Sequence, residues 1–268
     1  MVLHGEVRSV ERLTPSLVRV VLGGSGLRGF VMPDSTDTYV NLAIPPAGAP
    51  YGPVFDPREV RETTERHHWP ARRRYTVRRW DSGSQELRID FVVHGEEGVA
   101  GRWAGSAEPG DVLVFEGPAS GYRPDPEADW YLFVGDESAL PAIAASLEAL
   151  AEDALAVVRL VCDGPEYEVE LPSPGVLDLV WVHRTGGPGD ADLLPSAVRN
   201  LAFPAGRVDA FIHGEADEIR AIRKNLLRDR GLARSDMSCS PYWRHAMTDE
   251  AWREVKRDFV AAMEAESA

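Results

Sequence analysis

Residues 72–80 read Arg-Arg-Arg-Tyr-Thr-Val-Arg-Arg-Trp, so five arginines surround a tyrosine–threonine pair in a chain whose formal net charge is −14. Aromatic and β-branched residues at alternating positions predict a strand over Arg73–Trp80. Because successive side chains of a strand point to opposite faces, Arg73 and Tyr75 share one face. The opposite face carries Arg74, Thr76 and Arg78.

A guanidinium beside an aromatic ring suits a ligand that carries both phosphates and a flat ring system. Arginine binds phosphate through two parallel hydrogen bonds, while tyrosine stacks on a ring. The strand alone leaves a second interpretation open, since exposed basic side chains on a strand also protect a sheet edge from aggregation.

Composition limits the classes of partner. The 268 residues suffice for two domains, and 44% hydrophobic with 27% charged residues is typical of a soluble globular protein. With 43 acidic against 29 basic side chains, we expect no nucleic-acid partner and no anionic membrane partner outside a local basic patch. No apolar run reaches the roughly 20 residues of a membrane span, and the N-terminus lacks a signal pattern, so we expect a cytoplasmic protein without an integral membrane segment.

The chain has two cysteines, Cys162 and Cys239, far apart in sequence. This spacing predicts neither a disulfide framework nor a protein-ligated iron–sulfur cluster, and both residues are expected to be buried or half-buried thiols. The doublet His67-His68 lies in a polar stretch without carboxylate or cysteine spacing, so we predict no metal site.

The first half of the chain, residues 1–123, predicts a small antiparallel β-barrel. Short alternating runs separated by turn residues give six strands: Val2–Val10, Leu17–Leu22, Tyr39–Ile44, Arg73–Trp80, Glu86–His94 and Asp111–Gly117. The Pro/Gly-rich stretch from Pro45 and the polar stretch through Arg66 are expected to form a long loop without a core of its own.

The second half, residues 124–268, changes to alternating strands and helices. Strands are predicted over Trp130–Val134, Ala154–Val161, Leu179–His183 and Val208–Ile212, and helices over Leu140–Glu152, Leu193–Leu201 and Asp217–Arg230. This alternation predicts a parallel sheet with flanking helices. A closing helix over Thr248–Glu266 has helical apolar spacing, and core packing is the favoured role for Tyr242 and Trp243 just before it.

Ligands of open parallel sheets bind beyond the carboxyl ends of the strands. The residues at these ends are Gly135-Asp136-Glu137-Ser138, Cys162-Asp163, His183-Arg184 and His213-Gly214-Glu215. The run at 135–138 leads into a helix and is suited to hold a dinucleotide phosphate, because glycine permits close approach and a helix N-terminus attracts anions. A tight turn with an acidic helix cap explains the same residues equally well.

A second glycine-rich loop follows the strand that ends at His94. Residues 95–104 read Gly-Glu-Glu-Gly-Val-Ala-Gly-Arg-Trp-Ala and run into a short helix. The backbone amides of Gly98, Val99 and Ala100 are suited to bind a pyrophosphate at the helix start. An ordinary crossover helix of the barrel is the alternative.

Four of these motifs together resemble the siderophore-interacting protein family of the ferredoxin-reductase-like superfamily. They are the Arg-x-Tyr-Thr strand at 73–76, the glycine loop ending in Trp103-Ala104 before Pro109-Gly110-Asp111, the run Gly135-Asp136-Glu137-Ser138-Ala139-Leu140-Pro141, and Tyr242-Trp243-Arg244. The resemblance runs nearly end to end. It implies FAD on the barrel, NADPH or NADH on the second domain, and reduction of ferric siderophores in the cytoplasm.

The resemblance also implies which residues contact the cofactors. For FAD they are Arg73, Tyr75, Thr76, Arg78, Phe91, Val92, Val93, His94, Gly98, Val99 and Ala100. Among these, Arg73 would bind phosphate, Tyr75 would stack on the isoalloxazine, and Thr76 would hydrogen-bond near its reactive nitrogen. For the nicotinamide nucleotide they are Asp136, Glu137, Ser138, Gly214 and Glu215.

Two positions depart from the family pattern. The phosphate loop has Val99 and Gly101 where the family usually has Pro and, two residues on, Ser or Thr, which removes a side-chain hydroxyl contact at position 101. The glycine usual after Tyr-Trp-Arg is replaced by His245-Ala246.

A flavin can pass electrons singly to Fe³⁺, and hard oxygen donors hold the resulting Fe²⁺ less firmly. The protein therefore needs no catalytic side chain and no iron ligand of its own. Tentative contacts for an anionic siderophore are Arg72, Arg74, Arg79, Tyr242 and Trp243. A monomer is expected, and the alternatives are a reductase for a protein partner or a flavin-binding sensor without turnover.

Overall fold

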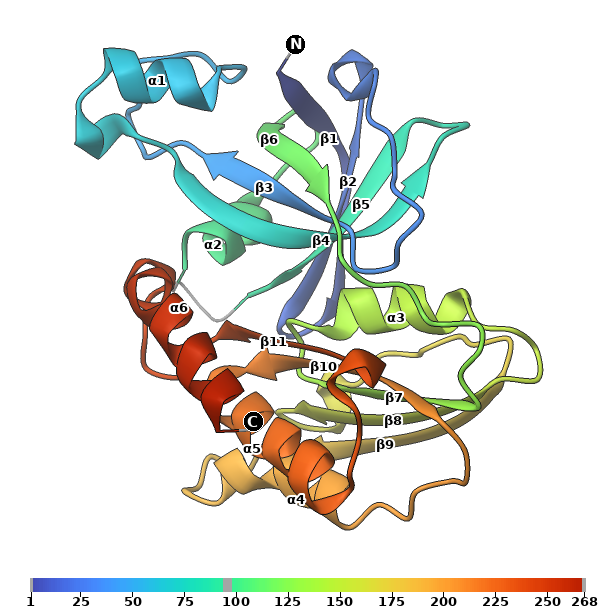
Figure 1. Ribbon diagram of the computed structural model, residues 1–268. Coiled ribbons are helices and arrows are strands. Elements are labelled where there is room, and N and C mark those ends of the chain that lie inside the picture. Colours follow the sequence, from blue (N-terminus) through green and yellow to red (C-terminus); the bar gives the residue numbers. More distant parts are fainter. Residues whose placement is uncertain (1, 94–97, 267–268) are drawn as a thin grey trace. The chain divides into compact units, whose positions relative to one another are not determined.

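The computed structural model describes residues 2–93 and 98–266. The chain divides into two compact units, Met1–Arg123 and Pro124–Ala268. The first contains the barrel and the second the parallel sheet (Figure 1).

Six antiparallel strands close the barrel of the first unit in the order β1-β2-β5-β4-β3-β6. Their bounds are β1 Leu3–Thr14, β2 Leu17–Gly23, β3 Tyr39–Ile44, β4 Ala71–Asp81, β5 Glu86–Val92 and β6 Val112–Ala119. The predicted six-stranded barrel is confirmed. The predicted strand ends differ from these bounds by up to four residues, most of all at the end of β1.

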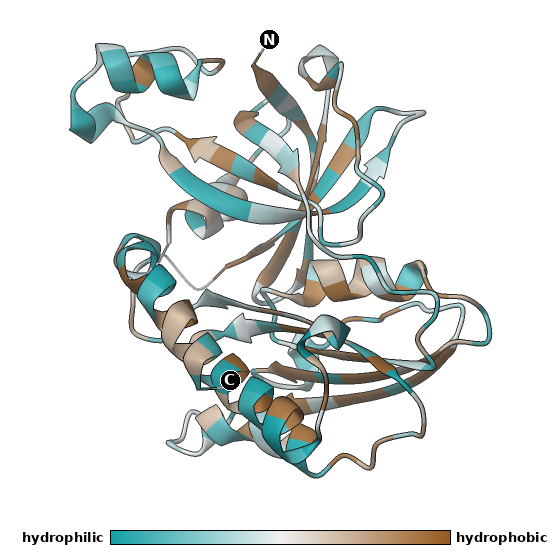
Figure 2. Ribbon diagram, viewed as in Figure 1, coloured by the Kyte–Doolittle hydropathy of each residue, from teal (hydrophilic) through white to brown (hydrophobic). Residues whose placement is uncertain are grey.

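The barrel interior is filled by alternating positions of its strands. Val40, Leu42 and Ile44 of β3 are buried, and they lie opposite Tyr75, Arg73 and Ala71 of β4. Directly opposed residues of an antiparallel pair project to the same face. Arg73 and Tyr75 therefore share the inner face of β4, although β4 is hydrophilic over most of its length in Figure 2.

A β-bulge interrupts this alternation in β4. Val77 pairs with Ile89 and Arg79 pairs with Arg88, so Arg78 is the extra residue. Val77 and Trp80 both pack against the barrel core although they are three positions apart. Because of the bulge, Arg78 and Arg79 both lie between the inward side chains of Val77 and Trp80. Simple period-two alternation does not predict this arrangement.

The segment between β3 and β4 corrects the expectation of a loop without a core. It contains α1 Pro57–Thr63 and a small apolar cluster of Phe55 and Val60 against Ala43 and Val114 of the barrel. The Asp56 carboxylate accepts a hydrogen bond from the Arg58 amide at 2.8 Å and caps the helix. An aspartate before a proline is a helix-start signal that the composition of the stretch concealed.

Helix α2, Val99–Ser106, fills part of the barrel with Ala100 and Ala104. Short 3₁₀ turns complete both units at Ser25–Leu27, Arg66–His68, Pro165–Tyr167, Asp190–Asp192 and Arg234–Asp236.

The second unit is built on a five-stranded parallel sheet in the order β11-β10-β7-β8-β9. The strands are β7 Trp130–Gly135, β8 Leu155–Cys162, β9 Val176–His183, β10 Val208–Glu215 and β11 Met237–Trp243. Helices α4 Leu193–Arg199 and α5 Ala216–Lys224 cover one face and α3 Leu140–Glu148 the other, with α6 Asp249–Ala265 beside them (Figure 1). The predicted parallel sheet with flanking helices is confirmed.

Three predicted boundaries in this unit change. The helix expected to run to Glu152 ends at Glu148. The helix expected to run to Arg230 becomes a π-helical turn at Asn225–Asp229. Tyr242 and Trp243 belong to β11 itself rather than following a strand.

The central strands β7 and β10 are buried at every position, because helices cover both faces of the sheet. Continuous apolar runs are the pattern of such strands, and Figure 2 draws β7 and β8 as largely hydrophobic. Of the polar residues of β10, His213 and Glu215 lie towards its carboxyl end and Asp209 lies near its start.

Candidate functional site

An aromatic row links the arginine strand to the glycine loop of the barrel. The Tyr75 ring of β4 lies 4.5 Å from the Phe91 ring of β5, at an interplanar angle of 33°. Phe91 in turn lies 5.6 Å from the Trp103 ring of α2. Three segments that the sequence analysis singled out separately therefore meet at one place.

Arg73 and Tyr75 are both half-buried on the same face of β4. The Arg73 guanidinium donates a hydrogen bond to the Arg72 carbonyl oxygen at 2.9 Å. Thr76 lies on the opposite face and pairs with Tyr39 of β3. Arg78, also half-buried, is the extra residue of the β-bulge.

The start of α2 has no side-chain cap among the described residues, because Gly98 at the N-cap has φ of 75° and no side chain. Among the residues that the structure describes, a Cβ atom at Gly98 would meet no other atom within 4 Å. Val92 and Val93 lead into this loop at the end of β5, whereas His94 lies outside the described residues.

The structure explains why position 101, where the family usually has Ser or Thr, is a glycine in this chain. A Cβ atom there would lie 2.9 Å from the Val92 carbonyl oxygen. Glycine at this position lets the first turn of α2 lie directly against the end of β5. The loss of a hydroxyl at position 101 thus coincides with close packing of helix on strand.

The other arginines near β4 have different surroundings. Arg72 forms an ion pair with Glu116 of β6, which also lies 3.5 Å from Arg58 of α1. Arg74 is exposed and its guanidinium lies 5.5 Å from the centre of the Tyr39 ring. Arg79 is exposed opposite Arg88. Arg74 and Arg79 therefore present the most accessible positive charge of the strand.

These barrel residues fit FAD. A half-buried tyrosine beside a half-buried arginine offers a stacking surface and a phosphate donor, and an uncapped helix start at a glycine offers backbone amides.

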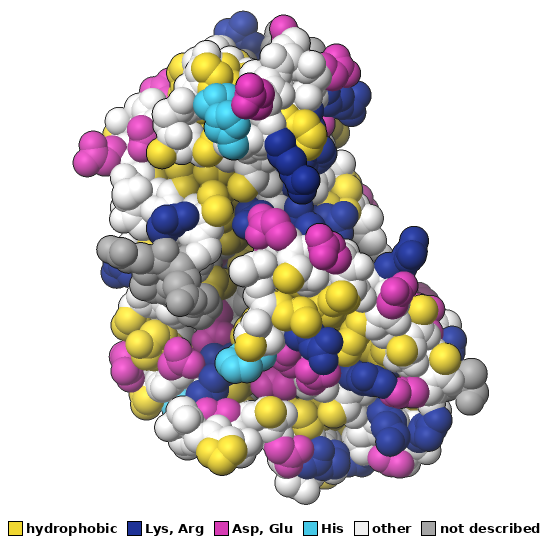
Figure 3. Space-filling view, turned by 90° about the vertical axis from the view of Figure 1, so that its left-hand side faces the viewer, with side chains coloured by type: hydrophobic (Ala, Val, Ile, Leu, Met, Phe, Trp, Pro, Cys, Tyr) yellow, Lys and Arg dark blue, Asp and Glu magenta, His cyan; other side chains and the backbone are white. Residues whose placement is uncertain are grey.

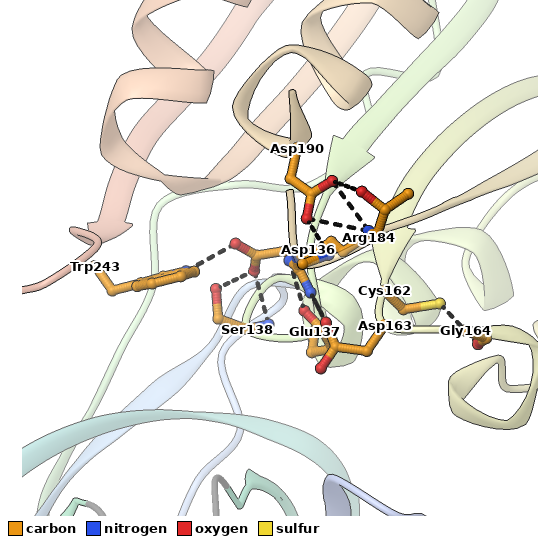
Figure 4. A network of polar contacts seen from close by, with 11 residues as sticks. Asp136, Glu137, Ser138, Cys162, Asp163, Gly164, Arg184, Asp190 and Trp243 are labelled. Carbon is orange, nitrogen blue, oxygen red and sulfur yellow. Dashed lines mark hydrogen bonds and ion pairs between the residues drawn. The ribbon is translucent and has the colours of Figure 1, made fainter. Parts of the chain in front are cut away.

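At the carboxyl end of β7, Asp136 is almost completely buried, with 1% of its surface exposed. Its Oδ1 accepts hydrogen bonds from the Ser138 amide at 2.8 Å and the Ser138 hydroxyl at 2.5 Å. Its Oδ2 accepts a hydrogen bond from the Trp243 indole at 2.7 Å, as Figure 4 shows. The main-chain carbonyl oxygen of Asp136 accepts hydrogen bonds from the backbone amides of Ala139 and Leu140. The Asp136 side chain thus closes the tight turn before α3, but the N-cap residue of α3 is Ala139, which has no side-chain cap, so the acidic helix cap of the alternative interpretation is not formed.

Gly135 and Gly214 are required by the packing of the sheet itself. A Cβ atom at Gly135 would lie 2.6 Å from the His213 carbonyl oxygen, and one at Gly214 would lie 2.8 Å from Asp136 Oδ2. Gly214 also has φ of 151°. Their glycine identity therefore does not by itself indicate a bound dinucleotide.

Beyond Asp136, the carboxyl edge of the sheet carries further ion pairs and caps. The two Glu137 oxygens accept hydrogen bonds from Arg184 at 2.7 and 3.1 Å, and Arg184 also donates to Asp163 at 3.0 Å (Figure 4). The Glu215 carboxylate caps α5 and also accepts a hydrogen bond from the His245 amide at 3.0 Å. Arg184 is thus already held by two carboxylates.

His213 is buried and stacks on Phe211, with ring centres 3.8 Å apart. Burial lowers its pKa from 6.5 to about 3, so the ring is neutral. Tyr242 meets this ring edge-on at 4.9 Å. Burial also raises the pKa of Cys162 to about 11 and of Cys239 to about 12, so both thiols stay protonated, as expected for buried or half-buried cysteines.

Both units match protein-family models. Residues 6–122 match the siderophore-interacting FAD-binding domain, and residues 128–246 match the siderophore-interacting protein model. The chain belongs to the siderophore-interacting protein family. The predicted family and an FAD-binding N-terminal domain are thereby confirmed.

Relatives of this family extend over nearly the whole chain. An uncharacterised protein of Mycobacterium tuberculosis H37Rv is 39% identical over 279 residues, covering 97% of this chain and 96% of the relative. The ferric vibriobactin reductase of Vibrio cholerae is 35% identical over 252 residues, covering 91% and 90%. The crystal structure of a siderophore utilization protein from T. fusca superposes with a TM-score of 0.79 at 38% identity, covering 93% of this chain and 95% of that one.

Sequence reasoning named Trp103 only as part of a motif and Arg184 only as a strand-end residue, and it did not single out Glu218. The contact of Trp103 with Phe91, the pairing of Arg184 with Glu137 and the burial of Glu218 had no local signal. Among residues 2–93 and 98–266 no group of three or more metal-binding side chains comes together. Within the same residues no helix is long and apolar enough to cross a membrane.

Proposed function

We propose that this protein is an FAD-dependent reductase of ferric siderophores that draws its electrons from NADH or NADPH. The observation that carries the proposal is the contact of Tyr75 and Phe91 with Trp103 of α2, a helix whose start at Gly98 is uncapped, within a domain of the siderophore-interacting FAD-binding family. The 35% identity to a ferric vibriobactin reductase over 91% of the chain supports the substrate class.

In this proposal the barrel residues bind and orient the flavin. Tyr75, supported from behind by Phe91, presents its ring to the isoalloxazine, and Arg73 binds the FAD phosphates. Thr76 and Arg78 contact the flavin from the same strand, and the amides of Gly98, Val99 and Ala100 bind the pyrophosphate. Flavin, when bound, supplies the chemistry that this chain lacks, since it accepts a hydride and gives up electrons one at a time.

The second unit is proposed to hold the nicotinamide dinucleotide. Its sheet order places β7 beside β10, and from these strands the chain continues to β8 on one side and to β11 on the other. Open parallel sheets bind dinucleotides at such a reversal of strand order. Asp136, Glu137 and Ser138 follow β7, whereas Gly214 and Glu215 end β10.

A ferric siderophore is proposed to dock near Arg74 and Arg79, the exposed arginines of β4. We keep Arg72 as a weaker candidate, because Glu116 compensates its charge. Trp243 and Tyr242 are proposed to support Asp136 and His213 rather than to contact the siderophore directly. A cytoplasmic location and a monomeric state stay predictions.

The test is an anaerobic titration of the purified protein. We expect a yellow protein with a flavin spectrum that NADH or NADPH bleaches and that a ferric siderophore then restores, with Fe²⁺ trapped by a ferrous-specific dye. A colourless protein that ignores added FAD would contradict the whole proposal. A flavin that bleaches but is not reoxidised by any ferric siderophore would contradict only the substrate.

A further inference from the structure

Four carboxylates are buried around the carboxyl ends of β7 and β10. Asp136, Glu137, Glu215 and Glu218 have 1%, 5%, 7% and 7% of their surfaces exposed. The first three are held by the partners described above: Asp136 by Ser138 and Trp243, Glu137 by Arg184, and Glu215 by the amides at the start of α5.

Glu218 differs from the other three. It lies in the first turn of α5, and its Oε2 is buried without a hydrogen-bond partner among the described residues. An ionised carboxylate without a partner is costly to bury, whereas a neutral carboxyl group is much less so.

Charged groups at the carboxyl ends of β7, β9 and β10 act on Glu218. They are Asp136 at the end of β7, Glu137 in the turn after it, Glu215 at the end of β10 and Arg184 after β9. Three carboxylates thus face Glu218 against one guanidinium. Burial, and then the charge of Asp136, raise its pKa to about 8, so Glu218 is protonated at neutral pH.

The protonated Glu218 belongs to a cluster at the edge of the sheet where the dinucleotide is proposed to bind. Glu215 and Gly214 end β10, and Gly135 and Asp136 end β7, so the cluster lies where the strand order reverses. That edge is where the dinucleotide is proposed to bind, and its pyrophosphate brings two further negative charges.

We propose that Glu218 must carry a proton for the nicotinamide dinucleotide to bind, so that binding at alkaline pH takes one proton from solvent. The inference rests on the proposed function for the position of the dinucleotide. Below the pKa of Glu218 the site is already protonated and binding leaves the proton count unchanged. Above it, the ionised carboxylate must first be neutralised, because a fourth buried carboxylate opposes the pyrophosphate.

The experiment is calorimetric titration of the FAD-loaded protein with tetrahydro-NADH and tetrahydro-NADPH, which bind without giving a hydride. Each titration is run from about pH 7 to about pH 9.5 in two buffers of different ionisation enthalpy, so that the heat reports proton uptake. For the wild type we expect affinity to weaken by about tenfold per pH unit well above pH 8, with uptake approaching about one proton per dinucleotide.

Glu218→Gln keeps the shape and removes the titration. Its affinity should stay constant across this range, with no proton uptake from this position. Glu254→Gln, an exposed residue of α6, is the matched control and should behave as the wild type.

Binding without proton uptake in the wild type, or uptake that persists in Glu218→Gln, would overturn the inference and leave the proposed function standing. Absence of binding by both analogues at every pH, in the wild type and in Glu218→Gln, would overturn the nicotinamide step of the proposed function as well. Should Glu218→Gln not fold, Glu218→Met is titrated in its place with the same expected absence of proton uptake, and binding of the wild type without uptake still overturns the inference.

Discussion

Arg73 lies on the same face of β4 as Tyr75, half-buried, while Arg79 on the same strand is exposed. Replacing Arg73 with Ala should remove a charge-assisted phosphate bond worth about 1.5–3 kcal/mol, which is about a tenfold to hundredfold loss of FAD affinity. Titration of the apoprotein with FAD, followed by flavin fluorescence, measures the loss. Arg79→Ala is the control and should bind FAD normally; an equal loss in both variants would point to general electrostatics instead.

His213 makes the stability of the second unit sensitive to acid. Its pKa is about 3 in the folded protein and near 6.5 in the unfolded chain, so the unfolded chain takes up a proton first as the pH falls. Stability is therefore lost from about pH 6.5 downward, and a lone group of this kind costs about 2 kcal/mol between about pH 7 and 5.

Replacing His213 with Phe keeps a ring on Phe211 and removes the titration. Urea unfolding near pH 7 and pH 5 should show a smaller loss of stability in His213→Phe than in the wild type. Equal losses in the two proteins would mean that other groups cause the acid sensitivity.

Helix α2 is positioned by a contact that leaves no room for a side chain. A Cβ at Gly101 would lie 2.9 Å from the Val92 carbonyl oxygen, whereas one at Gly105 would meet only the Val93 side chain at 3.8 Å. Gly101→Ala should destabilise the first unit by about 1–3 kcal/mol and weaken FAD binding, because the helix start must move.

Gly105→Ala, in the same helix, should instead be neutral or stabilising by up to about 1 kcal/mol, since alanine favours helix over glycine. Thermal unfolding and FAD titration of both variants measure the difference. Identical effects of the two substitutions would show that Gly101 does not set the position of α2.

The excess of acidic residues over the whole chain contrasts with the basic surface of β4. On the face drawn in Figure 3, acidic and basic side chains are interspersed rather than collected in one acidic patch. Charges at an exposed site act over about 8 Å at physiological salt, so the nearby Arg74 and Arg79 outweigh distant carboxylates there.

We therefore expect kcat/KM for an anionic ferric siderophore to fall as salt rises, while flavin reduction changes much less. Arg74→Ala and Arg79→Ala should lower kcat/KM without changing the bound FAD, since they would affect capture rather than chemistry. A neutral siderophore is the control and should lack the salt dependence. Rates for anionic siderophores that ignore salt and both substitutions would exclude this surface as the docking site.

At each scale, the features predicted from the sequence are those that depend on neighbours along the chain. Alternation of apolar and polar residues identified all six barrel strands and the two faces of β4 before its bulge, because a strand exposes every second side chain to the core. Strand–helix alternation identified the parallel sheet for a similar reason. The small cluster around Phe55 and Val60 was missed, since it is formed with Ala43 and Val114 from other parts of the chain.

What the tertiary structure decided is which distant residues share a low-dielectric environment. Asp136 and Trp243 are 107 positions apart and are joined by one hydrogen bond. Glu218 is an ordinary first-turn glutamate in sequence, and its pKa of about 8 arises only when β7, β9 and β10 bring other charges beside it and exclude water. The periodicity of a sequence predicts which side of a helix or strand is buried. The strand order decides which residues surround that side, and these neighbours determine the charge state of a buried carboxyl group.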